Sequence, residues 1–369
     1  MSLKGKHVFF ISEQDRFFYL FGDALICKLG VPHENIIPIV FKTALSPISS
    51  PRLNDVCYLD YENVAIENIA EAKSVTFMSL NKWNSPIAKR LLDYSNTLSS
   101  KIYIFITDDE VERWDKSFQA YGRLKADDKL HIAPECIDLL GKNAFFIAPK
   151  PYFYKKISSV CERDNLNFID ASIIFDILPT TYSDLMQQIM LKNFNYGDEK
   201  YKVLIDTKRK SRKEIVDFLK SDAAKKISVK AEFYCFVKPS RRVALDCYLF
   251  VKRLFGGIKF DVNYLSPMSP QVYNAFLASC THLILQDRGG ASTARLFAKW
   301  GAGRIAVRKN SPNQYFLEGS YGIELYVYNE RSMIGYDFFD NDNFDPEISK
   351  GNVLAEEERS IVSLAKVYL

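Results

Sequence analysis

The chain has 369 residues, of which 47% are hydrophobic and 25% are charged, and its 49 Lys and Arg residues against 45 Asp and Glu residues give a net charge of only +4. This length favours two domains over one, and the composition is typical of a globular protein with a sizeable hydrophobic core. The small net charge argues against a nucleic-acid partner, which would require a much larger basic surface.

Cysteine usage and hydropathy indicate the compartment. The 7 cysteines are scattered, without a CxxC pair, which argues against a disulfide framework and favours a reducing environment. The opening residues MSLKGKHVFFIS lack the long apolar run of a signal peptide, and no segment approaches the roughly 18 apolar residues that span a bilayer. We therefore expect a cytoplasmic protein, with peripheral contact to the inner face of the membrane left open.

The first half of the chain alternates β-rich runs with helical patterns. The expected strands cover residues 7–11, 36–41, 74–80, 101–107 and 144–148, and the expected helices cover residues 17–29, 87–94, 111–118 and 134–140. This βαβα alternation predicts a mainly parallel sheet covered by helices. From Lys150–Pro151–Tyr152 to Gly197 we expect a less regular passage between domains, with one helix at residues 183–192.

The second half repeats the alternation. The expected strands cover residues 202–206, 229–236, 259–265, 283–286, 304–307 and 324–328, and the expected helices cover residues 211–220, 242–254, 270–279 and 291–300. After an acidic, irregular stretch, a last helix at residues 356–368 is long enough to cross back onto the first domain. The predicted fold class is therefore α/β, with a Rossmann-like domain at residues 1–195 (linker included), a second at residues 196–355, and a C-terminal helix at residues 356–369.

A glycine turn links an expected strand to an expected helix in the second half. Asp287–Arg288–Gly289–Gly290 follows the strand at 283–286, and the helix opens on Ala291, Ser292 and Thr293. Free N–H groups and the positive end of the helix dipole favour an anion above such a turn, and glycine allows close approach. The alternative is an ordinary tight βα connection, because a single glycine turn is a weak fingerprint.

Two basic turns follow other strands of the same half. The first is Thr207–Arg212, which contains Lys208, Arg209, Ser211 and Arg212, and the second is Arg308–Lys309–Asn310. Ligands of open α/β sheets bind beyond the carboxyl ends of the strands, where these turns are expected. A solvated charged turn is the alternative for each. Together with the glycine turn, they favour an anionic, nucleotide-like ligand.

The first half offers carboxylates at the corresponding places. Glu13 and Asp15 follow the first strand, and Asp108, Asp109 and Glu110 follow the strand at 101–107. A carboxylate facing a cleft can act as a general base, although helix capping and salt bridges are the common alternatives. Adjacent acids on one turn diverge, so we expect no metal site at Asp108–Glu110.

Two further features carry a structural expectation. The four histidines are isolated, and His282, which directly precedes a strand, is expected to be structural. The helix at Arg241–Phe255 combines apolar residues with cations at both ends. We expect it to pack against the core, with contact to a membrane surface as the alternative.

The order of these motifs resembles that of GT-B glycosyltransferases, and more narrowly that of the bacterial 4-acetamido-4,6-dideoxygalactose transferases of enterobacterial common antigen synthesis. Phe21–Leu25 is similar to the F-x-D-A-L helix of that family, and residues 203–214 are similar to its strand and polar turn. Leu265–Ser266, the following helix, the glycine turn and Arg308–Asn310 follow the order of its later motifs, and Gly289–Thr293 replaces its glutamine-rich turn.

The resemblance implies two Rossmann-like domains facing across a cleft, with a nucleotide diphosphate sugar held by the second domain. Arginines 209, 212 and 308 would neutralise the leaving diphosphate. Asp15, Asp108 or Asp109 would deprotonate the acceptor hydroxyl. The residues implied in donor binding are Lys208, Arg209, Ser211, Arg212, Asp287, Arg288, Gly289, Gly290, Ser292, Thr293, Arg308 and Asn310.

The resemblance also bears on the mechanism and the acceptor. The E-x7-E arrangement of retaining GT-B enzymes is missing, since position 295, eight residues after Asp287, is Arg. This favours an inverting, metal-independent hexosyltransferase that needs no cofactor and acts in bacterial polysaccharide biosynthesis. The expected acceptor is a surface glycan, free or lipid-linked. The alternatives are a nucleotide-sugar epimerase of the same fold, disfavoured because the three turns contain no histidine, and a non-catalytic glycosyltransferase-like subunit.

Overall fold

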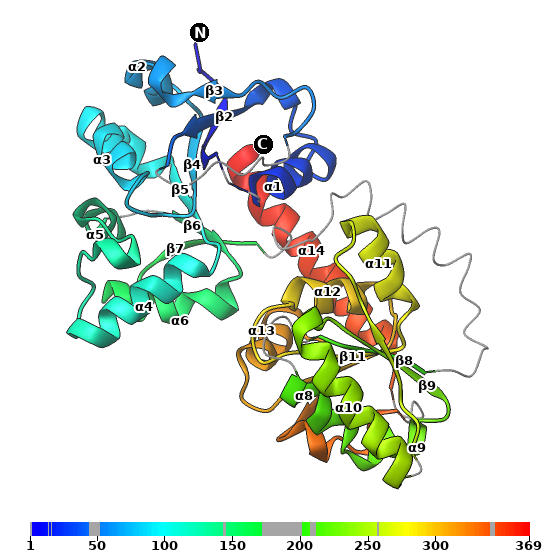
Figure 1. Ribbon diagram of the computed structural model, residues 1–369. Coiled ribbons are helices and arrows are strands. Elements are labelled where there is room, and N and C mark those ends of the chain that lie inside the picture. The colour runs from blue at the N-terminus through cyan, green and yellow to red at the C-terminus, as the bar shows by residue number, and fades with distance from the viewer. Residues whose placement is uncertain are drawn as a thin grey trace. The chain divides into compact units, whose positions relative to one another are not determined.

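Strands alternate with helices along both halves of the chain in the computed structural model (Figure 1). The structure describes residues 2–13, 15, 17–43, 52–142, 145–171, 201–206, 212–256, 258–339 and 344–369. The chain forms two units, Met1–Thr180 with Glu357–Leu369, and Thr181–Glu356. The helix expected at residues 183–192 lies outside the described residues.

The first unit contains a seven-stranded sheet with the order β3-β2-β1-β4-β5-β6-β7, in which the paired strands are parallel. Its strands are β1 (His7–Ser12), β2 (Ile36–Phe41), β3 (Leu59–Asp60), β4 (Ser74–Met78), β5 (Ile102–Phe105), β6 (Phe145–Ala148) and β7 (Asn167–Asp170). Its helices are α1 (Phe17–Cys27), α2 (Ile66–Ala70), α3 (Ser85–Tyr94), α4 (Asp109–Tyr121), α5 (Pro134–Gly141) and α6 (Lys150–Cys161).

Side chains of β1 alternate between two cores, as the two-residue period of a strand requires. Val8 and Phe10 pack on the face covered by α2 to α6, whereas Phe9 and Ile11 pack on the face covered by α1 and the end of the chain. The sheet is therefore buried on both faces, which explains why β1 is almost continuously apolar.

The segment after Lys150 corrects the sequence analysis, which expected an irregular passage there. It forms α6 and then β7, which pairs with β6 as the edge strand of the first sheet. Pro151 lies in the first turn of α6, where a missing N–H costs nothing, so it begins the helix instead of breaking it. Phe153, Ile157 and Val160 form the buried stripe of this helix.

The second unit contains a six-stranded sheet with the order β10-β9-β8-β11-β12-β13, again with parallel pairs. Its strands are β8 (Tyr201–Ile205), β9 (Ala231–Cys235), β10 (Asp261–Tyr264), β11 (His282–Ile284), β12 (Arg304–Arg308) and β13 (Leu325–Tyr328). Its helices are α8 (Arg212–Leu219), α9 (Asp222–Ile227), α10 (Pro239–Gly256), α11 (Pro270–Ser279), α12 (Ala291–Lys299) and α13 (Pro312–Tyr321). Helices α8 and α10 lie side by side in Figure 1. These two sheets confirm the predicted fold class of two Rossmann-like α/β domains.

The last helix, α14 (Pro346–Tyr368), begins ten residues before the predicted start at 356. The expected irregular stretch was wrong there because Pro346 suits a first helical turn and Gly351 does not end the helix. Its C-terminal residues pack within the first unit: Leu364 and Tyr368 are buried beside β1, and the Tyr368 hydroxyl lies 2.7 Å from Thr76 Oγ1.

In both sheets the first strand of the unit lies in the interior. The next strands are added on one side of it, and the later strands are added on its other side. The reversal lies between β1 and β4 in the first sheet and between β8 and β11 in the second. In open α/β sheets, ligands bind beyond the carboxyl ends of the strands at such a switch point. Each unit therefore has one favoured edge for a ligand site. Among the helices of the described residues, none is both long and apolar enough to span a bilayer.

Candidate functional site

The switch point of the second sheet brings an aspartate against the glycine turn. Asp206 directly follows β8, is 4% exposed, and its N–H donates to Ile284 O at 2.9 Å. Gly290 has a φ of +81°, and a Cβ built on it would lie 2.5 Å from Asp206 Oδ2. Both the left-handed backbone and the close approach therefore require glycine at position 290.

A buried asparagine holds the same turn from the other side. Asn313, in the first turn of α13, donates from Nδ2 to Gln286 O at 2.5 Å and to Gly289 O at 2.8 Å. Its backbone N–H donates to Asp287 O at 3.2 Å. Because Asn313 is only 3% exposed, these bonds are shielded from water and fix the path of the turn.

The glycine turn leads into the N-terminus of α12, where Gly290 is the N-cap and Ala291, Ser292 and Thr293 form the first turn. Helix geometry leaves the first N–H groups without partners inside the helix, and the dipole adds positive potential. Thr293 is buried and its side chain bonds to the Tyr273 hydroxyl, whose pKa is raised by burial and then by the nearby Asp206. Ser292 is partly exposed, so its hydroxyl remains accessible from solvent.

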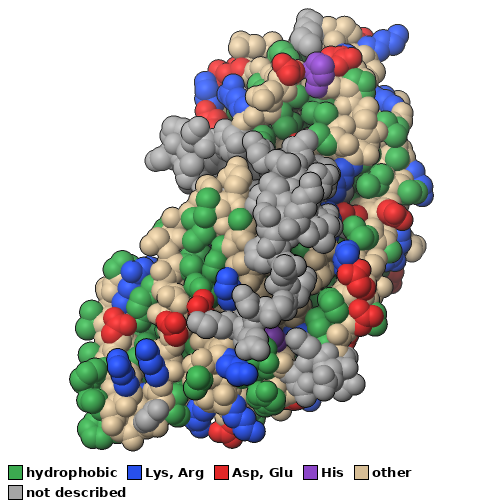
Figure 2. All heavy atoms as spheres, turned by 90° about the vertical axis from the view of Figure 1, so that its right-hand side faces the viewer, with side chains coloured by type: hydrophobic (Ala, Val, Ile, Leu, Met, Phe, Trp, Pro, Cys, Tyr) green, Lys and Arg blue, Asp and Glu red, His purple; other side chains and the backbone are tan. Residues whose placement is uncertain are grey.

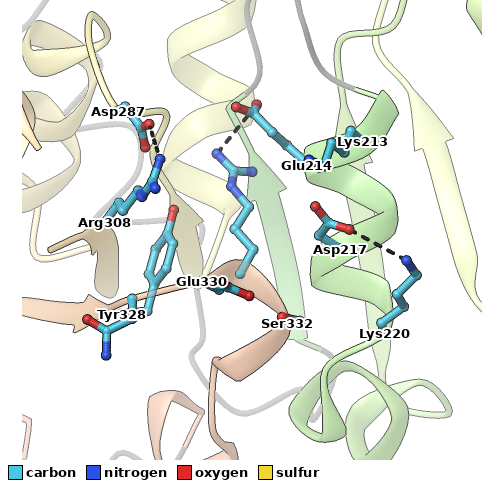
Figure 3. A pocket seen from close by; sticks show the side chains of 11 residues that line it. Lys213, Glu214, Asp217, Lys220, Asp287, Arg308, Tyr328, Glu330 and Ser332 are labelled. Carbon is cyan, nitrogen blue, oxygen red and sulfur yellow. Dashed lines mark hydrogen bonds and ion pairs between the residues drawn. The ribbon is translucent and has the colours of Figure 1, made fainter.

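The end of β12 is joined to the glycine turn by an ion pair. Arg308 Nη1 lies 3.0 Å from Asp287 Oδ2, and both side chains are about half exposed (Figure 3). Asn310, two residues on, has a φ of +58°, and its N–H donates to Gln314 Oε1 at 2.7 Å. The structure thus brings Asp287, Gly289, Gly290 and Arg308 together at one edge of the sheet.

A cavity of about 480 Å³ adjoins this ion pair. Asp287, Arg308 and Tyr328 border it on one side and α8 on the other, as Figure 3 shows. Four cations and four acids line it: Lys213, Lys220, Arg308 and Arg331, with Glu214, Asp217, Asp287 and Glu330. Its size is within the range of small-molecule sites, and its mixture of donors and acceptors suits a ligand rich in hydroxyl groups.

Arg331 is the most buried charge in the lining of this cavity, with 7% of the residue exposed. Its Nη2 donates to Leu285 O at 3.3 Å and lies 3.8 Å from Glu214 Oε2. Its Nη1 is buried and has no hydrogen-bond partner among the described residues. A buried donor without a partner is costly, so an acceptor at this position would stabilise the folded chain.

Only one of the four site residues predicted in the basic turn after β8 lies within the described residues. Lys208, Arg209 and Ser211 lie outside the described residues, whereas Arg212 is the exposed first residue of α8. Arg288 in the glycine turn is also exposed. The roles assigned to these five residues remain predictions.

In the first unit, Asp15 follows β1 at the switch point of the sheet. Its Oδ1 accepts bonds from the N–H groups of Phe17 at 2.9 Å and Phe18 at 2.7 Å, so it caps α1. Burial raises the pKa of Asp15 to about 6, although the two N–H bonds act in the opposite direction. Both of these bonds end on Oδ1, so Oδ2 takes no part in capping Phe17 and Phe18. A carboxylate with a pKa near 6 suits a general base near neutral pH.

The acids after β5 separate into different environments. Asp108 is partly buried and has a φ of +82°, a strained backbone for a residue other than glycine. Asp109 is exposed in the first turn of α4. Glu110 is fully buried and accepts bonds from the N–H and hydroxyl of Thr107, and burial raises its pKa. Asp108 thus stays a candidate base beside Asp15, and Glu110 stabilises the turn.

The histidines of the two sheets lie away from the candidate sites. His7 and His282 begin β1 and β11, at the opposite ends of these strands from the candidate sites. Burial lowers the pKa of His7 to about 4 and that of His282 to about 3, so both are neutral and structural. Among the described residues, no three His, Cys, Asp or Glu side chains gather as a metal site.

Four residues of this edge were not among the predicted site residues: Asp206, Tyr273, Asn313 and Arg331. Asp206 could have been found as the acid at the carboxyl end of the first strand of the second domain, since Asp15 was noticed because it follows the first strand of the first domain. Asn313 follows Ser311–Pro312, a helix-start pattern that indicates where it lies but not what it bonds. Nothing in the sequence indicates Tyr273 or Arg331.

No protein-family model and no curated protein sequence matches the chain. Solved structures match over nearly its whole length. A glycosyltransferase from Rickettsia africae is 12% identical, with a TM-score of 0.56 over 99% of this chain and 98% of that one. Sucrose-phosphate synthase from Thermosynechococcus elongatus is 11% identical, with a TM-score of 0.52 over 97% and 94%. Anabaena HepE, in complex with UDP-glucose, is 11% identical, with a TM-score of 0.51 over 98% and 98%. At such low identity these likenesses establish the GT-B type of fold and nothing finer.

Proposed function

We propose that the chain is a glycosyltransferase that uses a nucleotide diphosphate sugar bound at the carboxyl edge of the second sheet. The observation that carries the proposal is the glycine turn at the N-terminus of α12, held between Asp206 and Asn313 at the switch point. This arrangement presents backbone N–H groups to an anion. The likeness to solved glycosyltransferase structures over almost the whole chain supports it.

In this mechanism the second unit holds the leaving group. The first N–H groups of α12 and the Ser292 hydroxyl contact the diphosphate, and Arg308 and Arg212 offset the charge that develops on it. We assign the same role to Lys208, Arg209 and Ser211, because they follow β8 in the sequence. Asp287, Arg288, Gly289 and Asn310 shape the remaining wall.

The first unit supplies the base. Asp15 Oδ2 takes the proton of the acceptor hydroxyl while that oxygen bonds to the anomeric carbon, and the carbon–oxygen bond to the diphosphate breaks in the same step. One displacement of this kind inverts the anomeric configuration and needs no metal. The raised pKa of Asp15 supports this role, and Asp108 with its strained backbone is the second choice, ahead of the exposed Asp109.

The order of motifs along the chain supports a donor of the 4-acetamido-4,6-dideoxygalactose type and a bacterial surface-glycan acceptor, lipid-linked and reached at the cytoplasmic side of the membrane. The epimerase alternative is disfavoured because His7 and His282 lie at the amino ends of their strands. A non-catalytic subunit would bind the donor without consuming it.

Thermal unfolding with a panel of nucleotide diphosphate sugars tests the proposal. A donor at about 100 times its Kd adds roughly 2.7 kcal/mol to the free energy of unfolding, which raises Tm measurably. We expect one sugar nucleotide to give a larger shift than its free nucleotide. If no sugar nucleotide shifts Tm, the proposal is wrong. If the donor binds but is neither transferred nor hydrolysed, the chain is a binding subunit.

A further inference from the structure

Helix α10 exposes an apolar stripe to solvent. Five of its hydrophobic side chains are at least half exposed: Val243 at 68%, Phe250 at 62%, Val251 at 50%, Leu254 at 59% and Phe255 at 85%. Positions 243, 247, 250 and 254 follow the spacing of one helical face, and Cys247 in this series is exposed too. We call these six residues the α10 stripe.

The stripe does not face the hydrophobic core. The core-facing side of α10 is formed by Leu245, which is fully buried, with Tyr248 and Leu249 packed against the same cluster. A surface helix normally carries polar residues on the side away from the core. Helix α10 is instead apolar on two sides, so the expected core packing accounts for only one of them. A contiguous exposed apolar patch indicates a binding surface.

Cations border the stripe. Helix α10 contains Arg241, Arg242, Lys252 and Arg253, against Asp246 as its single acid. Asp246 accepts a hydrogen bond from the Tyr264 hydroxyl at 2.6 Å. Arg241, which precedes the stripe, and Arg253, near its C-terminal end, are both exposed. Figure 2 shows exposed hydrophobic side chains interspersed with Lys and Arg side chains, and with some Asp and Glu side chains, at the lower left of that view.

We propose that the α10 stripe docks on the surface of an anionic lipid bilayer. Bulky apolar side chains bordered by Lys and Arg are the features of a helix that lies in the membrane interface. Phe250, Leu254 and Phe255 insert at the boundary between headgroups and acyl chains, while the exposed Arg241 and Arg253 contact anionic headgroups. Each cation near such a surface contributes about 1 kcal/mol, and the attraction weakens with salt.

The same charges disfavour a second copy of this chain as the occupant. A two-fold interface pairs each residue with its counterpart across the axis. If two α10 helices paired through the stripe, each would bring four cations against a single acid close to the other, and this like charge opposes pairing. An anionic surface attracts both arginines at once.

This inference goes beyond the proposed transfer reaction and does not depend on it. It places the docking surface on a helix of the second unit, away from the turn that holds the donor. Membrane binding and donor binding are therefore separate measurements.

Flotation of the full chain with lipid vesicles tests the proposal. We expect binding to vesicles that contain phosphatidylglycerol, weaker binding to phosphatidylcholine alone, and release at high salt. The variant Phe250→Ser/Phe255→Ser should bind at least about tenfold more weakly, because it removes the two largest inserting side chains. Arg241→Glu/Arg253→Glu should lose binding selectively for the anionic vesicles.

A matched control removes two apolar side chains that are more than half exposed on another helix. Ile348 and Val362 on α14 are 54% and 61% exposed, and Ile348→Ser/Val362→Ser should bind vesicles like the wild type. All variants should keep the wild-type Tm and donor-induced Tm shift. The proposal is overturned if the wild type does not bind anionic vesicles, or if Phe250→Ser/Phe255→Ser binds them unchanged. It is also overturned if the wild type is a dimer that this variant converts to a monomer.

Discussion

An aspartate follows the first strand of each sheet at its switch point, but the two aspartates have different surroundings. Asp15 caps α1 through Oδ1 and keeps Oδ2 outside the cap, and burial raises its pKa to about 6. Asp206 is almost fully buried against Gly290 and near Tyr273. The first arrangement suits proton transfer, whereas the second supports a turn that presents N–H groups to a ligand.

One topology thus positions two different chemical environments in the two units. Both edges use a helix N-terminus, but in the first unit a carboxylate of the chain already occupies it. In the second unit the glycine turn brings backbone in place of a side chain. That difference supports the proposed base in the first unit and the proposed anion site in the second, and the following changes test the proposal.

Asp15→Asn should have the largest effect. Asparagine is also a good N-cap, so the fold should persist. Because the variant lacks the general base, kcat should fall by the typical contribution of such a base, about 10²–10⁴-fold. Because a base acts only when ionised, wild-type kcat/KM should fall as pH drops through about 6, the pKa of Asp15. Steady-state kinetics across pH measure both effects.

Asp60→Asn is the matched control for Asp15→Asn, since Asp60 caps a short helix of the same unit through the N–H of Glu62. It should leave transfer unchanged. Full activity of Asp15→Asn would contradict the assignment and would direct the search to Asp108.

Gly290→Ala should come next. The left-handed backbone alone costs roughly 1–2 kcal/mol in a residue with a Cβ, and the new Cβ also displaces Asp206. Both the free energy of unfolding in urea and the affinity for the donor should fall. Gly30→Ala is the control, because Gly30 has a φ of +72° and open space around a new Cβ. It should lower the free energy of unfolding and leave donor affinity unchanged. Equal donor affinity in the two variants would show that the turn does not bind the donor.

Asn313→Ala removes the two side-chain bonds to the carbonyls of Gln286 and Gly289. Buried carbonyls left without partners cost roughly 1–3 kcal/mol, which urea unfolding would detect. Donor affinity, measured by calorimetry, should fall as well because the turn loosens. Asn352→Ala, which removes one exposed bond to Gly322 O, should have little effect on either quantity.

Arg308→Ala should have the smallest effect on stability and a selective effect on binding. Its ion pair with Asp287 is half exposed, and such pairs contribute at most about 1 kcal/mol. A charged hydrogen bond to the donor would contribute about 1.5–3 kcal/mol, so the donor Kd should rise at least about tenfold. Lys309→Ala, at an adjacent exposed residue, is the control. An unchanged Kd in Arg308→Ala would exclude Arg308 from the donor site.

The sequence predicted some of the candidate site and none of its internal contacts. The glycine turn was visible because Gly289 and Gly290 stand between an apolar run and a helical pattern. Its contact with Asp206 joins residues 84 positions apart, and its bonds to Asn313 join the turn to a different helix, α13. Such pairings depend on strand order, which local periodicity does not contain.

By itself, the sequence determined the alternation of strands and helices, because apolar periodicity and turn residues act over short distances. It therefore determined the two parallel sheets and the acids and glycines at their edges. Only the tertiary structure decided the strand order, the helix α6 and strand β7 that extend the first sheet, and which side of α10 meets the core. Those features depend on packing between distant residues, and packing left the α10 stripe exposed although the sequence favoured its burial.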